Sequence, residues 1–182
     1  MSDSFQVEGA DIVFRSHVFD VERRTIRHGK TKFRRDVAVH PGAVAILPIN
    51  AAGEVGFIRQ YRATFDEFLL EIPAGTRDIP DEEPLETAKR ELLEELGFEA
   101  KEWTLLGRFM NSPGWTTQVM IIYEARDLTE GVRAPAGPEE SSSTILWLAP
   151  DMIREAFRSA SAVDSTTAIA LHRIFGTFFD ES

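Results

Sequence analysis

Residues 75–98 read GTRDIPDEEPLETAKRELLEELGF, a polar loop followed by a helix-forming run that ends at a glycine. Pro84 suits the first position of a helix, and Gly97 suits the position just past its end. At about 100° of rotation per residue, Glu91, Glu94 and Glu95 fall within an arc of about 100°. The neighbouring apolar stripe consists of Leu85, Ala88, Leu92 and Leu96. We therefore expect three carboxylates at the rim of the buried face.

These acids are unfavourable in a helix that has no other role. Glu91 and Glu95 stand four positions apart and repel each other, and a helix C-terminus prefers cations. Arg90 can partly neutralise Glu94, which lies one turn further on. Clustered carboxylates suit a hard divalent cation, especially Mg²⁺, which proteins commonly hold through a few carboxylates and the phosphates of a substrate. The alternative is a solvated helix face with salt bridges.

The run resembles the Nudix box, whose pattern is G-x5-E-x7-R-E-U-x-E-E-x-G-U with U a bulky apolar residue. Every position from Arg90 to Phe98 matches, and Glu82 lies eight residues before Arg90 as the pattern requires. Gly75 is the one departure, because six residues rather than five separate it from Glu82. A longer loop costs little free energy, and some ADP-ribose pyrophosphatases of this family carry it. The resemblance implies a Nudix hydrolase of the ADP-ribose pyrophosphatase-like or nucleoside diphosphate sugar hydrolase branch.

The resemblance also implies roles for the box residues. Glu91 and Glu95 are the expected metal ligands, with Glu94 next. The segment EIPAG, residues 71–75, is similar to the family's E-[IL]-P-A-G lead into the box, where the alanine carbonyl, here Ala74, completes the metal shell. The expected cofactor is Mg²⁺, for which Mn²⁺ can substitute. The box residues with an expected structural role are Gly75, Glu82, Arg90 and Gly97, with Glu82 and Arg90 forming an ion pair that anchors the loop.

Composition agrees with a compact enzyme. A chain of 182 residues with 43% hydrophobic residues and 13 Phe is long enough to bury a substantial core. The absence of cysteine excludes disulfides and thiolate chemistry and suits a reducing compartment. The first residues show no signal region, and no apolar run approaches the ~18 residues that cross a bilayer. We expect a cytoplasmic protein that does not bind membranes.

The net charge of −10 argues against a general nucleic-acid-binding protein, because backbone recognition requires a basic surface. It does not argue against a nucleotide ligand. A metal and a few arginines bind the phosphates of a small molecule locally, whatever the charge of the whole chain.

The chain reads as strands around two or three helices. Extended segments are expected at 5–16, 32–40, 43–49, 54–62, 68–73, 103–110, 119–125 and 144–148. Besides the box helix, helices are expected at about 150–159 and 165–175, and Gly29 is a candidate hairpin turn. The polar segment 128–143 has the composition of a mobile loop.

This order fits the α/β (α+β) Nudix fold, a mixed sheet between helices. A small N-terminal β element would cover residues 1–41, and the Nudix hydrolase domain would cover residues 42–182. Pyrophosphatases of this kind use such an element to dimerise. The resemblance therefore implies a homodimer.

Three features bear on the substrate. FIRQYR, residues 57–62, resembles the RQYR strand of ADP-ribose and nucleotide-sugar pyrophosphatases, so Arg62 and then Arg59 would hold phosphate; pairing with surface acids is the alternative. Pro113 follows Gly97 by sixteen residues, where a proline marks ADP-ribose pyrophosphatases. Trp115 would stack on a base or sugar, or else pack in the protein. Gln118 replaces a glutamate that is common in related enzymes, which removes an anionic ligand.

The family chemistry implies cleavage of a pyrophosphate bond, with ADP-ribose as the leading substrate and AMP and ribose 5-phosphate as products. A hydrolase of ADP-glucose or GDP-mannose is the alternative enzyme, and a sensor that binds ADP-ribose without hydrolysis is the alternative outside catalysis. Glu140 is the first candidate for the general base and Glu139 the second, because similar enzymes place a catalytic glutamate on a mobile loop here. Solvated loop acids are the alternative, which would leave Glu94 as the base.

Overall fold

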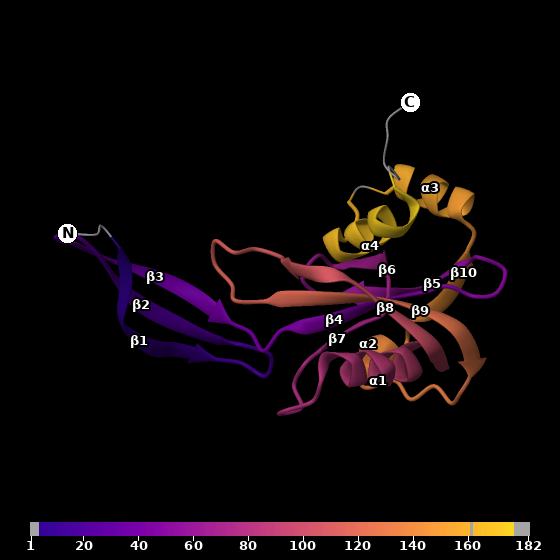
Figure 1. The fold of residues 1–182 in the computed structure, drawn as a ribbon, viewed down its shortest axis with the longest axis horizontal. Coiled ribbons are helices and arrows are strands. Elements are labelled where there is room, and N and C mark those ends of the chain that lie inside the picture. The colour runs from indigo at the N-terminus through magenta and orange to yellow at the C-terminus, as the bar shows by residue number, and fades with distance from the viewer. Residues whose placement is uncertain (1–3, 161, 177–182) are drawn as a thin grey trace.

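The computed structural model describes residues 4–160 and 162–176, and its body is a layer of strands between two pairs of helices (Figure 1). On one side lie α1 (Pro84–Leu96) and the short α2 (Pro138–Ser141). On the other lie α3 (Pro150–Arg158) and α4 (Ser165–Phe175). The expected α/β architecture, a mixed sheet between helices, is confirmed.

The strands of the body form two sheets. The larger has the order β7-β4-β9-β8 and comprises β4 (Ala43–Pro48), β7 (Ala74–Thr76), β8 (Phe98–Met110) and β9 (Val119–Glu130). Within it β4 and β9 are parallel and the other pairs are antiparallel. The smaller has the order β10-β5-β6 and comprises β5 (Val55–Arg62), β6 (Glu67–Glu71) and β10 (Thr144–Leu148).

A third sheet at the N-terminus projects from the body (Figure 1). It is an antiparallel meander of β1 (Phe5–Arg15), β2 (Asp20–His28) and β3 (Thr31–Val39). Gly29 lies in the turn between β2 and β3 with a φ of 57°, which glycine adopts at little cost. Every residue of β1 is exposed.

The core has two parts, one on each side of the strands. Phe57 of β5 packs with Ile153 of α3 and Leu171 of α4 in one cluster. Leu92 and Leu96 of α1 pack with strand residues in the other, as the apolar stripe predicts. The box helix is thus held against the sheet by the face that borders its acids.

The polar segment 128–143 is more ordered than its composition suggests. β9 continues to Glu130 because it pairs along its length with β8, where Phe98 lies opposite Glu130. Residues Pro138–Ser141 form α2. Pairing with a neighbouring strand outweighs local polarity here, since strand formation depends strongly on context. Within the described residues, no helix has both the length and the apolar character needed to cross a membrane.

Candidate active site

The box helix places two of its acids inside the protein. α1 begins with Pro84 in its first turn and ends at Gly97, which has a φ of 76° and donates its N–H to the Leu93 carbonyl. Between these ends, Glu91 is 7% exposed and Glu95 is 2% exposed. Carboxylates this buried need compensating partners.

Strand β7 closes over these two carboxylates. A Cβ atom placed on Gly75 would lie 1.9 Å from Cδ of Glu91, so the absence of a side chain at residue 75 makes room for the Glu91 carboxylate. The N–H of Ala74 donates a hydrogen bond of 2.8 Å to Oε2 of Glu95. This contact is through the N–H of Ala74, and a role of its carbonyl as a metal ligand stays a prediction.

Burial dominates the electrostatics of the pair. Desolvation raises the pKa of Glu91 to about 7, although Arg90 beside it acts in the opposite direction. Desolvation also raises the pKa of Glu95 well above its ordinary value, and the charge of Glu91 adds to this. At both carboxylates burial therefore outweighs the nearby positive charge, which comes from Arg90 at Glu91 and from Arg62 at Glu95.

Arg90 contacts several of the surrounding acids. It lies 3.4 Å from Glu82, which is the ion pair expected to anchor the loop. It also lies 2.8 Å from Glu91 and 3.1 Å from Glu94. Glu94 is therefore turned toward Arg90. Among the described residues, no group of three or more acidic, histidine or cysteine side chains is gathered closely enough to hold a metal ion.

The donor chemistry nevertheless fits a hard cation. Glu91 and Glu95 offer carboxylate oxygens, which are the ligands that Mg²⁺ and Mn²⁺ prefer. Both carboxylates are buried, and bound positive charge would offset the desolvation that raises their pKa values. Phosphate oxygens of a substrate commonly complete such a shell.

The two arginines of the FIRQYR strand lie on different sides of their sheet. Successive side chains of a strand alternate, so positions three apart face opposite ways. Arg62 forms an ion pair of 2.5 Å with the buried Glu71, which also accepts a hydrogen bond of 3.1 Å from Gln60. The charge of Glu95 acts on the pKa of Arg62, which places Arg62 near the buried acids.

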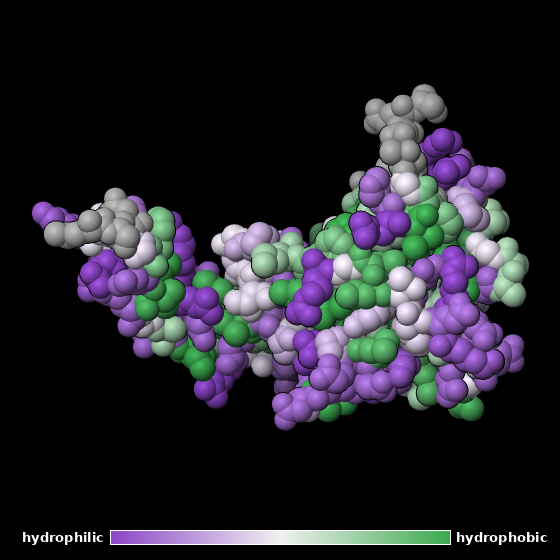
Figure 2. Space-filling model, in the orientation of Figure 1, coloured by the Kyte–Doolittle hydropathy of each residue, from purple (hydrophilic) through white to green (hydrophobic). Residues whose placement is uncertain are grey.

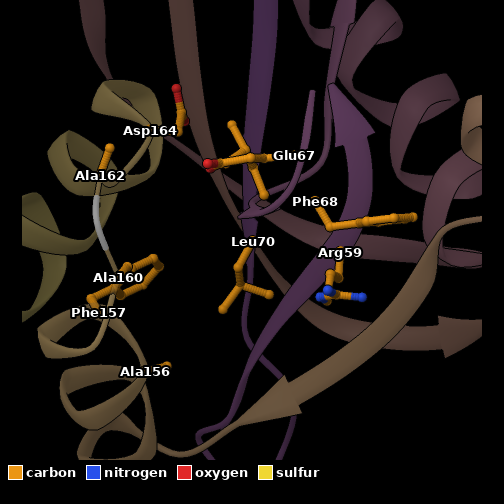
Figure 3. A pocket seen from close by; sticks show the side chains of 10 residues that line it. Arg59, Glu67, Phe68, Leu70, Ala156, Phe157, Ala160, Ala162 and Asp164 are labelled. Atoms are coloured by element: carbon orange, nitrogen blue, oxygen red, sulfur yellow. The ribbon is translucent and has the colours of Figure 1, made fainter. Parts of the chain in front are cut away.

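Arg59 lies elsewhere. Its guanidinium carbon is 4.6 Å from the centre of the Phe68 ring. It lines a pocket between β6 and α3, together with Leu70 and Phe157 (Figure 3). The expectation that Arg59 joins Arg62 on the substrate phosphates is therefore not supported, because strand alternation separates them.

The loop between β8 and β9 contacts the N-terminal sheet. The carbonyl of Trp115 accepts a hydrogen bond of 2.8 Å from the N–H of Ala38, while residue Trp115 as a whole is 60% exposed. Gln118 accepts a hydrogen bond of 3.0 Å from Asn111, and its amide lies 3.4 Å from Nε2 of His40. Gln118 thus forms a polar network with Asn111 and His40. Pro113 lies in the same loop, and contacts of Pro113 and Trp115 with substrate stay predictions.

The two loop glutamates act on different groups. The charge of Glu140 contributes to the raised pKa values of both Glu91 and Glu95. Its own carboxylate accepts a hydrogen bond of 2.6 Å from the N–H of Ala136. The charge of Glu139 acts instead on Tyr61. The charge of Glu140 thus acts on the box acids, and its role as the general base stays a prediction.

Two residues of the candidate active site, Glu71 and Arg133, are not predicted from the sequence. The sequence predicts for Glu71 only a place in the lead into the box, and its partner Arg62 is nine residues away. Arg133 donates to the main-chain carbonyls of Glu95 and Glu140, although nothing in its local sequence marks it. One feature of the sequence does point to such a residue. The C-terminal end of α1 is acidic, whereas a helix C-terminus prefers a cation, so a basic residue from elsewhere in the chain is expected there.

Comparison with known proteins agrees with this geometry. The model of the NUDIX domain matches residues 39–166. An ADP-ribose pyrophosphatase of Mycobacterium tuberculosis is 33% identical over 168 residues, which cover 92% of this chain and 80% of that protein. A methanol dehydrogenase activator of Bacillus methanolicus is 32% identical over 87% of this chain and 83% of its own length.

A solved structure is also similar. The crystal structure of an ADP compounds hydrolase superposes with a TM-score of 0.81 at 24% identity, covering 93% of this chain and 91% of the other. This match supports the fold. Together with the box and the family match, these similarities show that the chain belongs to the NUDIX family and is a Nudix pyrophosphohydrolase of the ADP-ribose pyrophosphatase-like branch.

Proposed function

We propose that this protein is a Mg²⁺-dependent hydrolase of ADP-ribose that releases AMP and ribose 5-phosphate. The observation that carries the proposal is the pair of buried carboxylates, Glu91 and Glu95, enclosed by Gly75 and the N–H of Ala74. ADP-ribose is favoured because the relatives include ADP-ribose pyrophosphatases from Mycobacterium tuberculosis and, at 30% identity over 161 residues, from Bacillus subtilis.

The residues divide the chemistry among them. Glu91 and Glu95 would hold the metal, which when bound neutralises pyrophosphate charge and lowers the pKa of water. Arg62 would orient the phosphates with its planar guanidinium, held in place by Glu71. Glu140 would accept the proton of the attacking water at its carboxylate. The water oxygen bonds to phosphorus as the bridging P–O bond breaks, and the second phosphate leaves as an anion.

The test is a substrate panel with identified products. The purified protein is assayed with Mg²⁺ and with Mn²⁺ on ADP-ribose, ADP-glucose, GDP-mannose, FAD, NADH and 8-oxo-dGTP. We expect the highest kcat/KM for ADP-ribose and none of these turnovers in EDTA. A preference for 8-oxo-dGTP would overturn the substrate assignment.

A matched pair of variants tests the ligand assignment. Glu95→Gln is expected to lower kcat by about 10²- to 10⁴-fold, as for other positioned catalytic groups. Glu155→Gln, at an exposed position on α3, serves as the control and should retain activity. Normal turnover by Glu95→Gln would contradict its role as a metal ligand.

A nucleotide-sugar hydrolase is the second candidate. A GDP-mannose pyrophosphatase of Salmonella arizonae is 29% identical over 169 residues, so hydrolysis of GDP-mannose or ADP-glucose would fit the same site. The substrate panel decides between these two enzymes. A sensor without catalysis would instead show metal-dependent binding of ADP-ribose with no products, which the same samples measure by calorimetry.

The N-terminal sheet supports a homodimer. Phe5 is 68% exposed and Val7 and Phe14 are also exposed, and Figure 2 shows apolar residues among charged ones over this arm. A small sheet with open edges and exposed apolar side chains favours a partner, and we propose a second copy of the chain. We also propose a cytoplasmic protein without nucleic-acid partners, since it lacks cysteine and carries a net charge of −10.

A further inference from the structure

Arg133 joins the box helix to the loop that carries Glu140. Its Nε donates a hydrogen bond of 2.6 Å to the carbonyl of Glu95. Its Nη2 donates to the carbonyl of Glu140 at 2.9 Å and to Oγ of Ser143 at 2.6 Å. One guanidinium therefore contacts the last turn of α1, the end of α2 and the residue that precedes β10.

On the helix side, Arg133 provides a hydrogen-bond donor and a positive charge that α1 itself lacks at its C-terminal end. The last carbonyls of a helix lack partners within it and carry partial negative charge. The last turn of α1 contains no basic residue and carries Glu94 and Glu95. Arg133 supplies both a hydrogen-bond donor and a positive charge at this end.

The main chain around Arg133 is also tied to α1. The N–H of Gly131 donates to the carbonyl of Gly97 at 2.8 Å, and the N–H of Ala134 donates to the carbonyl of Glu94 at 3.2 Å. A Cβ on Gly131 would lie 2.6 Å from Cδ1 of Leu93, which shows how closely this segment approaches the helix. Residues 131–134 therefore form a fixed base from which the Arg133 side chain reaches the loop.

On the loop side, α2 contacts β5 but has little else of its own to hold it. It spans four residues, none of them buried, and so short a helix is not stable alone. Its polar contacts with Ala136 and Gly137 lie within the same loop. Arg133 links the carbonyl of Glu140 to α1 through a planar, delocalised group that bonds several acceptors at once.

We propose that Arg133 is a positioning residue that sets where Glu140 stands relative to Glu91 and Glu95. This rests on the proposed function, in which Glu140 accepts the proton from water. Because Arg133 holds the main chains of Glu95 and Glu140 with the same guanidinium, a shift of either residue is resisted by the other. Glu95 keeps its place through α1 and through the N–H of Ala74, so Arg133 acts on turnover through Glu140. It loses its influence on turnover once the Glu140 carboxylate is gone.

A double-mutant cycle tests this dependence. The wild-type protein, Arg133→Met, Glu140→Gln and the double variant are compared in kcat and KM for ADP-ribose with Mg²⁺. We expect Arg133→Met to lower kcat by about 10- to 100-fold, because a small misplacement of a catalytic group has effects of this size. KM should stay nearly unchanged. The double variant should be no slower than Glu140→Gln, and independent, multiplicative losses would overturn the proposal.

Hydrogen exchange of the metal-free protein gives a readout without catalysis. Amides of residues 134–143 should exchange faster in Arg133→Met than in the wild-type protein, while those of α4 stay unchanged. Arg158→Met is the matched control, since Arg158 is an exposed arginine in the last turn of α3. Arg133→Lys should lie between the wild-type protein and Arg133→Met in both kcat and the exchange rate of the loop amides. If Arg133→Met fails to fold, Arg133→Lys takes its place in both assays. Unchanged exchange in the loop overturns the proposal.

Loss of the base assignment and loss of the positioning role give different kinetic results. If Glu140→Gln keeps its kcat, the assignment of the base is wrong and the positioning proposal falls with it. If Glu140→Gln is slow but Arg133→Met and Arg133→Lys turn over normally, the base assignment stands and the positioning role alone is overturned.

Discussion

Gly75 and Glu91 share a space that only one side chain can fill. A Cβ on Gly75 would overlap the Glu91 carboxylate, which is the far end of a flexible side chain. We expect Gly75→Ala to displace this carboxylate rather than to unfold the protein. The melting temperature should change little, while kcat falls by about 10-fold or more, as expected when a catalytic group is misplaced. A large loss of stability with normal kcat would contradict this.

The raised pKa of Glu91 predicts how stability varies with pH in the metal-free protein. An acid whose pKa is about 7 when folded and near 4.5 when unfolded binds more protons in the folded chain between these values. The free energy of unfolding should therefore decrease as pH rises from about 4.5 to about 7, by up to about 3 kcal/mol. Urea denaturation in EDTA across this range measures the decrease.

Glu91→Gln is the informative variant for that measurement. It carries no ionisable group at residue 91, so the decrease should become smaller, although Glu95, whose pKa is also raised, still contributes. Glu102→Gln, at an exposed position on β8, is the control and should follow the wild-type curve. A wild-type protein that gains stability between pH 5 and about pH 7 would contradict the prediction.

At the scale of single residues, the sequence predicts where the box acids lie on their helix better than it predicts which residues they contact. The helical arc correctly placed Glu91 and Glu95 beside the apolar stripe. The spacing of four also predicted the ion pair of Arg90 with Glu94, which the structure confirms. It could not show that Arg90 contacts the adjacent Glu91 as well, because neighbouring positions on a helix do not normally face each other. The separation of Arg59 from Arg62 was within reach of the sequence, since a spacing of three in a strand reverses the side.

Helix α4 is connected through its N-terminal cap to the lead into the box, residues 71–75. Asp164 accepts hydrogen bonds from the N–H and the hydroxyl of Thr167, at 2.8 Å and 2.9 Å. The oxygen of that hydroxyl accepts a bond of 3.1 Å from the N–H of Ile72, two residues before Ala74. The cap therefore orients a buried threonine that supports the lead into the box.

Removing this cap should cost stability. We expect Asp164→Ala to lower the free energy of unfolding by about 1 kcal/mol, a typical value for an N-cap aspartate. Asp151→Ala on α3 is the control, because the Asp151 side chain is 96% exposed and does not cap its helix. Equal stability of the two variants in urea denaturation would show that the cap is dispensable.

The sequence predicts best the bounds of elements whose ends are marked by residues such as proline and glycine. Pro84 and Gly97 marked both ends of α1, and the strand at 144–148 and the helix at 165–175 have the expected bounds. The hairpin of β8 and β9 extends further than expected in both strands. Its outer residues are mostly polar, and only the partner strand reveals that they pair.

The N-terminal sheet predicts the behaviour of the whole molecule in solution. If a second copy covers its exposed apolar residues, light scattering should give the mass of a dimer, about twice the 20.4 kDa of one chain. Deletion of residues 1–41 should give an aggregating or inactive protein. A monomer at working concentrations would show that this sheet needs no second copy.

The parallel pairing of β4 with β9 bears on how the protein folds. Ala43 lies beside Met120, so the larger sheet closes only after the box helix and the long hairpin have been synthesised. Because pairing between such distant segments carries a large loop-closure cost, it is intrinsically slow. Ile121 of β9 also belongs to the cluster beneath α1. A nascent chain that has emerged only as far as Gly97 thus contains all the box acids together with β7, but lacks β9, which completes the cluster beneath α1.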